Sequence, residues 1–183
     1  MNILKLVPSL YSGNDGSIHV DIALHIDGVK LENYDTDPFD LFNLLRDPEW
    51  ITDPLERYVY FWTCSCGEPG CASLAESKIL KRDAETVSVG IPQPINYHSF
   101  ATHRDDPEKY DSGYKRWQVE HKVKLVTFNI ADLKAELLRF AQELREMTKN
   151  VTLWSYSGGH HKYEEDDDLI DMPTVIEESL QKL

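Results

Sequence analysis

All three cysteines of the chain lie within eight residues, in the segment FWTCSCGEPGCA at positions 61–72. A four-residue Gly-Glu-Pro-Gly loop separates Cys66 from Cys71, a spacing that structural zinc sites use. Cys64 is only two residues from Cys66, so a strand would have to bend for both sulfurs to reach an ion about 2.3 Å away. The segment could therefore hold zinc, but it supplies only three ligands.

A histidine would complete such a site, and His121 is the preferred fourth ligand. It lies in a predicted strand at 114–128, on one face with the apolar residues Trp117, Val119, Val123 and Leu125. An uncharged imidazole on an apolar face needs a metal or a hydrogen-bond partner. His98 and His103, in the irregular connection at 92–113, are alternatives. The predicted metal ligands are Cys64, Cys66, Cys71 and His121, and the cofactor is zinc or none.

Two other interpretations of the cysteines stay open. Cysteine behaves as a small hydrophobic residue, so the segment could be a packed turn at the end of a strand. A redox or catalytic thiol would need a lowered pKa, and the acidic Glu68 works against that. No catalytic residue is predicted.

Histidines and carboxylates occur together in two further places. His160 and His161 precede the acidic run Glu164–Asp168, but the spacing fits neither an EF-hand nor an HExxH site, and a solvated acidic loop is favoured. A predicted strand at 17–26 carries His19, Asp21 and His25 on its polar face, which is a weaker version of the same idea. The chain has no GxSxG, P-loop or GxGxxG motif.

Hydrophobic periodicity predicts the elements that carry these residues. SIHVDIALHI alternates as a half-buried strand does, and Asp27-Gly28 after it predicts a hairpin. ERYVYFWT, SKIL, ETVSVGIP and VTLWSYS are further predicted strands.

Three helices are predicted. A short one starts near Pro38, and a long one covers about 130–148 with Asn129 as N-cap and an apolar stripe. Charged residues behind that stripe, such as Glu136 and Arg139, are predicted to form a solvated face. The last helix has a Thr174–Glu177 capping-box signature. The predicted class is α+β, with a mostly antiparallel sheet packed by the long helix and shorter helices.

Length and charge limit the organisation and the partners. With 183 residues, we expect one α+β domain at 1–150, with a strand, an acidic loop and a C-terminal helix at 151–183 packed on it. The formal charge of −13 disfavours nucleic acid and anionic membranes and favours a basic partner. No apolar run approaches the length of a membrane span, no signal peptide is recognisable, and the clustered cysteines favour a reducing cytoplasm.

The segment TCSCGEPGCA, after an aromatic strand and before VTFNIADLKAELLRFAQEL, resembles a family of uncharacterised bacterial cytosolic proteins marked by T-C-x-C-G-x-x-G-C-[AG]. FDLFNLL upstream is also similar, and the likeness covers about residues 18–147. Ser73 and the GGHHKYEEDDD extension depart from the pattern. The resemblance implies a bacterial, cytosolic protein and carries no activity with it.

These observations lead to a non-enzymatic, acidic cytosolic protein that binds a basic protein partner, as an immunity or anti-toxin protein does. The alternative is a zinc metalloprotein using the cysteine cluster, and a weaker alternative is a thiol-dependent redox enzyme. The oligomeric state is left open.

Overall fold

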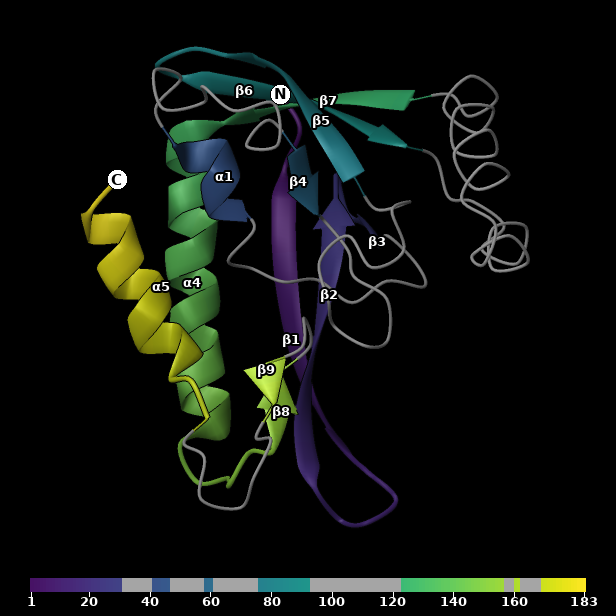
Figure 1. Cartoon of the computed structure of the whole chain (residues 1–183), viewed down its shortest axis with the longest axis vertical. Coiled ribbons are helices and arrows are strands. Elements are labelled where there is room, and N and C mark those ends of the chain that lie inside the picture. Colours follow the sequence, from purple (N-terminus) through teal and green to yellow (C-terminus); the bar gives the residue numbers. More distant parts are fainter. Residues whose placement is uncertain (31–40, 47–57, 61–75, 93–122, 157–159, 162–168) are drawn as a thin grey trace, which may run out of the picture.

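The chain forms an α+β structure in which one long helix packs against strands of two sheets (Figure 1). A computed structural model describes residues 1–30, 41–46, 58–60, 76–92, 123–156, 160–161 and 169–183. Every strand pair in the described part is antiparallel except one, β2 with β8. The predicted class and the long helix are therefore confirmed, whereas the strands belong to two sheets instead of one.

The first sheet is built on a long hairpin. Its strands are β1 (Leu4–Ser12), β2 (Ile18–Ile26), β3 (Val29–Lys30), β8 (Ser155–Tyr156) and β9 (His160–His161). They follow the order β1-β2-β8-β9, and β3 also pairs with β2. The turn between β2 and β3 has positive φ at both central residues, 54° at Asp27 and 78° at Gly28. Such a turn matches the twist of a hairpin and favours Asp-Gly, as the sequence predicts.

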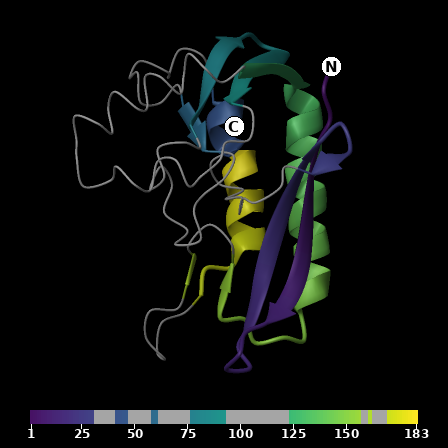
Figure 2. The same cartoon turned by 90° about the vertical axis from the view of Figure 1, so that its right-hand side faces the viewer.

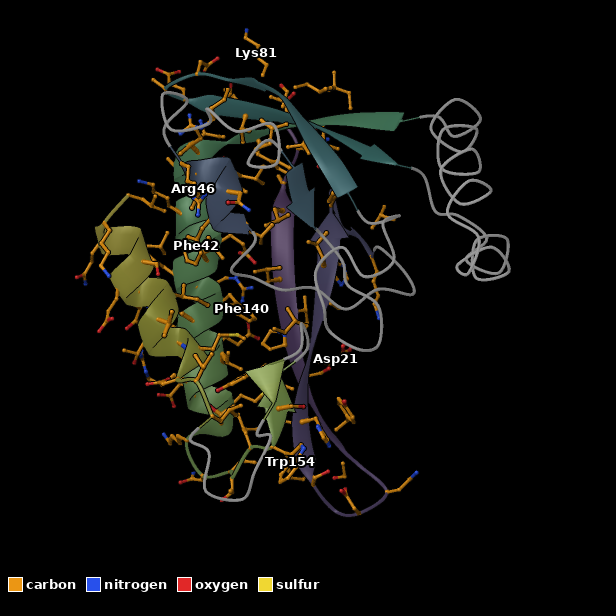
Figure 3. The ribbon with its side chains drawn as sticks, in the orientation of Figure 1. Asp21, Phe42, Arg46, Lys81, Phe140 and Trp154 are labelled. Atoms are coloured by element: carbon orange, nitrogen blue, oxygen red, sulfur yellow. The ribbon has the colours of Figure 1, made fainter. Side chains whose placement is uncertain are left out.

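The second sheet is a four-stranded antiparallel meander. It contains β4 (Tyr58–Tyr60), β5 (Glu76–Arg82), β6 (Thr86–Pro92) and β7 (Val123–Asn129) in that order. In the turn between β5 and β6, the Asp83 carboxylate accepts hydrogen bonds from the backbone N–H groups of Glu85 and Thr86. The sheet lies across the N-terminal end of the long helix in Figures 1 and 2, and Lys81 projects outward from it in Figure 3.

The described helices are α1 (Phe42–Leu45), α4 (Ile130–Thr148) and α5 (Met172–Gln181). As predicted, the Asn129 side chain caps α4, accepting from the N–H groups of Ala131 and Asp132 at 2.9 and 3.2 Å. The stripe that α4 buries includes Leu133, Leu137, Phe140, Ala141 and Leu144. It packs against the inward face of β1 and β2, where Leu6, Ile22 and Leu24 are fully buried.

The last helix starts earlier than its capping-box signature predicts. It begins at Met172, with Pro173 in its first turn, where a missing N–H costs nothing. The Thr174 hydroxyl donates to the Asp171 carboxylate at 2.6 Å, and Glu177 accepts from Arg145 of α4 at 2.6 Å. The predicted Thr174–Glu177 box is therefore wrong, because both side chains have other partners.

Candidate functional site

The predicted metal site cannot be placed. Cys64, Cys66, Cys71 and His121 all lie outside the described residues, as do the alternatives His98 and His103 and the acidic run Glu164–Asp168. His160 and His161 form strand β9, whose backbone pairs with Tyr156 and Ser155 of β8. Zinc binding therefore stays a prediction.

One premise for choosing His121 is contradicted on β7. The alternation that put His121 on an inward face also put Leu125 there, but Leu125 is 60% exposed. The neighbouring positions Val126 and Phe128 are the buried ones. In the described part of β7, the buried face is therefore the one that carries Val126 and Phe128. The prediction chose the opposite face because Leu125 is apolar.

The polar face of β2 is the second predicted place for chemistry. His19, Asp21 and His25 are all half-buried, and Figure 3 shows Asp21 on the side of β2 away from α4. Across the residues that the structure describes, no group of three histidines, cysteines or carboxylates could hold a metal ion. His19 instead belongs to a chain of hydrogen bonds, which we call the His19 cluster: Asp15, Ser17, His19 and Ser155.

The His19 cluster joins the β1–β2 turn to β8. The Ser17 hydroxyl donates to the Asp15 carboxylate and lies 2.6 Å from His19 Nε2, and His19 Nδ1 lies 2.8 Å from the Ser155 hydroxyl. The Ser17 hydroxyl and backbone N–H hold the pKa of Asp15 below its ordinary value, so this carboxylate is ionised near neutral pH and can only accept.

Proton counting then assigns the imidazole of the cluster. The single Ser17 hydrogen goes to Asp15, so the Ser17 oxygen must accept from His19 Nε2–H. When the imidazole is neutral, Nδ1 is then an acceptor, and the Ser155 hydroxyl donates to it. Tyr11 stacks on the His19 ring, with centroids 4.9 Å apart and an interplanar angle of 15°.

A hydroxyl donating to an imidazole that a third group orients is the arrangement of an activated nucleophile. Ser155 is only 5% exposed, however, and it is the one buried polar side chain in the described core. An attacking group must reach its substrate, so the cluster in this conformation fastens β8 to the hairpin. Sequence reasoning missed Ser17 and Ser155, although an Asp-Gly-Ser turn before an alternating strand was a usable signal.

The charged back of α4 is not simply solvated. Glu136 is only 12% exposed; it accepts from the Leu6 backbone N–H at 2.6 Å and from Arg139 at 2.7 Å. Arg139 in turn donates to the Leu6 carbonyl and to Glu143. The Glu136 hydrogen bond is the main cause that raises the Arg139 pKa. The predicted solvated face is therefore wrong for Glu136 and Arg139, which bind the edge of β1.

An open groove lies beside this contact. It has a volume of about 500 Å³ and is mostly apolar, with Leu4, Phe128 and Leu133 among its lining residues. Asp132, Glu136 and Arg139 contribute its charged side chains. Its size falls in the range of small-molecule sites, but Glu136 and Arg139 are already bound to each other and to Leu6.

Comparison with family models, with curated proteins and with solved structures finds no match to this chain. Within the described ranges, no helix combines the length and the apolar character needed to cross a membrane. The function must therefore be inferred from the residues themselves.

Proposed function

We propose that this chain is a non-enzymatic bacterial protein of the cytoplasm that binds a basic protein partner, in the manner of an immunity or anti-toxin protein. The charge of the sequence carries this proposal: 32 acidic residues outnumber 19 basic ones, a formal net charge of −13.

The clustering of part of this charge supports a binding role over a role in solubility alone. Charge that only keeps a protein soluble can be spread over the whole surface. Here five acidic residues follow one another in the sequence at Glu164–Asp168. Concentrated negative charge attracts a basic partner from a distance and raises the association rate, and salt screens this attraction.

The experiment starts with capture of host proteins on the immobilised chain at low salt, followed by kinetics with the purified partner. We expect a partner of high isoelectric point whose association rate falls by about tenfold or more between low and high salt. Absence of any basic partner at low salt would contradict the proposal.

Two matched variants locate the attraction. The triple variant E164Q/E165Q/D166N removes three charges from the acidic run, and E85Q/E146Q/E178Q removes three exposed charges elsewhere in the sequence. The first is expected to slow association several-fold more than the second. Equal effects would mean that total charge matters and its placement does not.

Zinc binding by Cys64, Cys66, Cys71 and His121 is the second proposal, supported by three cysteines around two glycines. Metal analysis of protein prepared without a histidine tag tests it. We expect close to one zinc per chain, lost in the double variant C66S/C71S; less than about 0.2 with reduced thiols would reject it. A thiol-dependent activity is the weaker proposal, and iodoacetamide reacting no faster than with a free thiol would reject it.

A further inference from the structure

The first half of β1 runs beside α4, with one set of its backbone groups facing away from β2 (Figure 2). Odd-numbered residues of β1 bond to β2, as both ends of the ladder show: Asp27 N–H donates to the Ile3 carbonyl, and Gly13 N–H to the Ser17 carbonyl. In an antiparallel pair the two sets alternate, so the N–H and carbonyl groups of even-numbered residues point outward.

Leu4 is the outward residue in the middle of this stretch. On either side of it, Asn2 N–H donates to the Thr127 carbonyl of β7, and Leu6 N–H donates to Glu136 of α4. Within the described residues, the outward N–H and carbonyl of Leu4 have no hydrogen-bond partner, although Leu4 is only 6% exposed. Buried backbone groups without a partner are rare, so such a donor and acceptor together mark a place for a ligand or water.

The side chains of α4 explain why Leu4 lacks a partner. One helical turn before Glu136, the same face of α4 carries Asp132. One helical turn rises about 5.4 Å and two strand residues about 6.8 Å, so Asp132 is the α4 residue at the level of Leu4. Aspartate is one CH2 group shorter than glutamate. In the part of the chain that the structure describes, no hydrogen bond or ion pair engages the exposed Asp132 carboxylate.

The open groove beside α4 lies at this gap. Leu4 and Asp132 both line it, together with the apolar side chains of Phe128, Leu133 and Ala135. Its volume of about 500 Å³ accommodates a small ligand. The groove therefore combines an apolar wall, a free carboxylate, and a backbone donor and acceptor without partners.

We propose that this groove binds the amino-terminal residue of a peptide whose first side chain is apolar. The carbonyl of that residue accepts from the Leu4 N–H, and its ammonium group donates to the Leu4 carbonyl, as facing residues of an antiparallel ladder do. The ammonium group also pairs with the Asp132 carboxylate. The apolar side chain packs against Leu133 and Ala135.

Two features favour a chain end over other ligands. The neighbouring outward residues, Asn2 and Leu6, already have partners, so only one residue of a ligand can pair with β1. A free carboxylate offers acceptors alone, so it leaves the Leu4 carbonyl without a donor, and Asp132 repels it. A ligand that satisfies the site therefore carries a free amine beside a neutral carbonyl, as the first residue of a peptide does.

Titration of the full chain with leucyl-alanyl-alanine amide, followed by backbone NMR, tests the proposal. We expect saturable binding with a dissociation constant of about 1 mM or lower. The Leu4 N–H should shift and exchange more slowly with solvent, whereas the Leu6 N–H, already bonded to Glu136, should change little. The N-acetylated peptide, which lacks the charge, and glycyl-alanyl-alanine amide, which lacks the apolar side chain, should each bind about fivefold more weakly or worse.

Variants of α4 test the same groove from the protein side. D132N removes the carboxylate and should weaken binding about threefold. A135L fills the groove and should weaken it about tenfold or more. The matched control is A131L, because Ala131 is also exposed on α4 but does not line the groove, and it should bind as the parent does. Leucine is a good helix former, so both leucine variants keep α4, which circular dichroism checks.

Three outcomes would overturn the proposal: no saturable binding below about 10 mM peptide, equal binding of the acetylated peptide, or a folded A135L variant that binds like the parent. A largest NMR shift far from Leu4 and α4 would overturn it as well. None of these outcomes bears on the basic partner, whose binding is measured separately.

Discussion

Two polar contacts fasten the β1–β2 hairpin to distant parts of the chain, and they are built differently. Near the start of β1, Glu136 and Arg139 of α4 bind the backbone of Leu6 with charged groups. At the other end, the His19 cluster reaches β8 through hydroxyl groups and an imidazole, and its carboxylate, Asp15, lies in the exposed turn.

The difference follows from what each contact must satisfy. The backbone N–H and carbonyl of Leu6 lie at the edge of the sheet and need hydrogen-bond partners. Side chains of α4 supply them, as a neighbouring strand would do elsewhere in a sheet. Charge-assisted hydrogen bonds are strong, but removal of one partner leaves the others buried and unpaired. The His19 cluster joins side chains, so its loss removes a link between elements and leaves fewer polar groups stranded.

Glu136→Gln should have the largest effect on stability. The amide keeps the shape of the side chain, but it loses the charge that holds Arg139 and the Leu6 N–H, and its NH2 group can face the guanidinium. We expect the free energy of unfolding to fall by about 1.5–3 kcal/mol, as measured by urea denaturation.

Glu143→Gln is the control for this variant, because Glu143 also binds Arg139 but is 48% exposed. Its loss should cost about 0.5 kcal/mol or less. Equal losses from the two variants would mean that the contact with β1 contributes little and that only the charge of Arg139 matters.

Ser155→Ala should have a smaller effect. It removes the donor to His19 Nδ1 and leaves that nitrogen partly accessible to water, since His19 is only half-buried. We expect a loss of about 1 kcal/mol. Nitrogen NMR of the imidazole should show the Nε2–H tautomer in the parent and a weaker preference for it in the variant.

Thr152→Ala changes a hydroxyl three residues earlier, at an exposed position, and should leave stability and the imidazole spectrum unchanged. An Nδ1–H tautomer in the parent would contradict the proton assignment within the His19 cluster.

Asp15→Asn should mainly change how the stability of the protein depends on pH. The folded pKa of Asp15 lies below its ordinary value of 3.8, so the folded state binds fewer protons than the unfolded state. The stability that this group adds is present above pH 3.8 and is lost as pH falls through the lowered pKa. The variant should therefore lose less stability than the parent on acidification, in urea denaturation at neutral and acidic pH.

Asp83→Asn is a useful comparison, because the N–H groups of Glu85 and Thr86 lower the Asp83 pKa in the same way in a turn far from the His19 cluster. Both variants should lose less stability than the parent on acidification. If only Asp83→Asn does so, Asp15 gains no stabilisation from its hydrogen bonds in solution.

Local patterns in the sequence were enough to predict most elements of the fold. Alternation predicted β2, Asp27-Gly28 predicted the hairpin turn, and Asn129 with its apolar stripe predicted α4. These features depend on neighbours within a few residues, so propensity and periodicity report them directly.

Contacts between distant residues were not predictable in this way. Glu136 is separated from Leu6 by 130 residues and Ser155 from His19 by 136. Neither Glu136 nor Ser155 lies in a sequence pattern that identifies its distant partner. Leu125 shows the same limit, because an apolar residue predicts burial only if the correct face of the strand is known. The proposed zinc ligands lie outside the described residues and stay predictions.

Glu177→Gln should have the smallest effect, although Arg145 and Glu177 join two helices with hydrogen bonds of 2.6 and 2.9 Å. The side chains are 44% and 30% exposed, so water and salt compete with the pair. Arg145 lowers the Glu177 pKa, so the contribution of the pair is present at neutral pH and is lost as pH falls through that lowered value. We expect a loss of stability smaller than that of Ser155→Ala, and a gap between parent and variant that closes in high salt. A loss as large as that of Glu136→Gln would mean that burial does not separate the strong polar contacts of this chain from the weak ones.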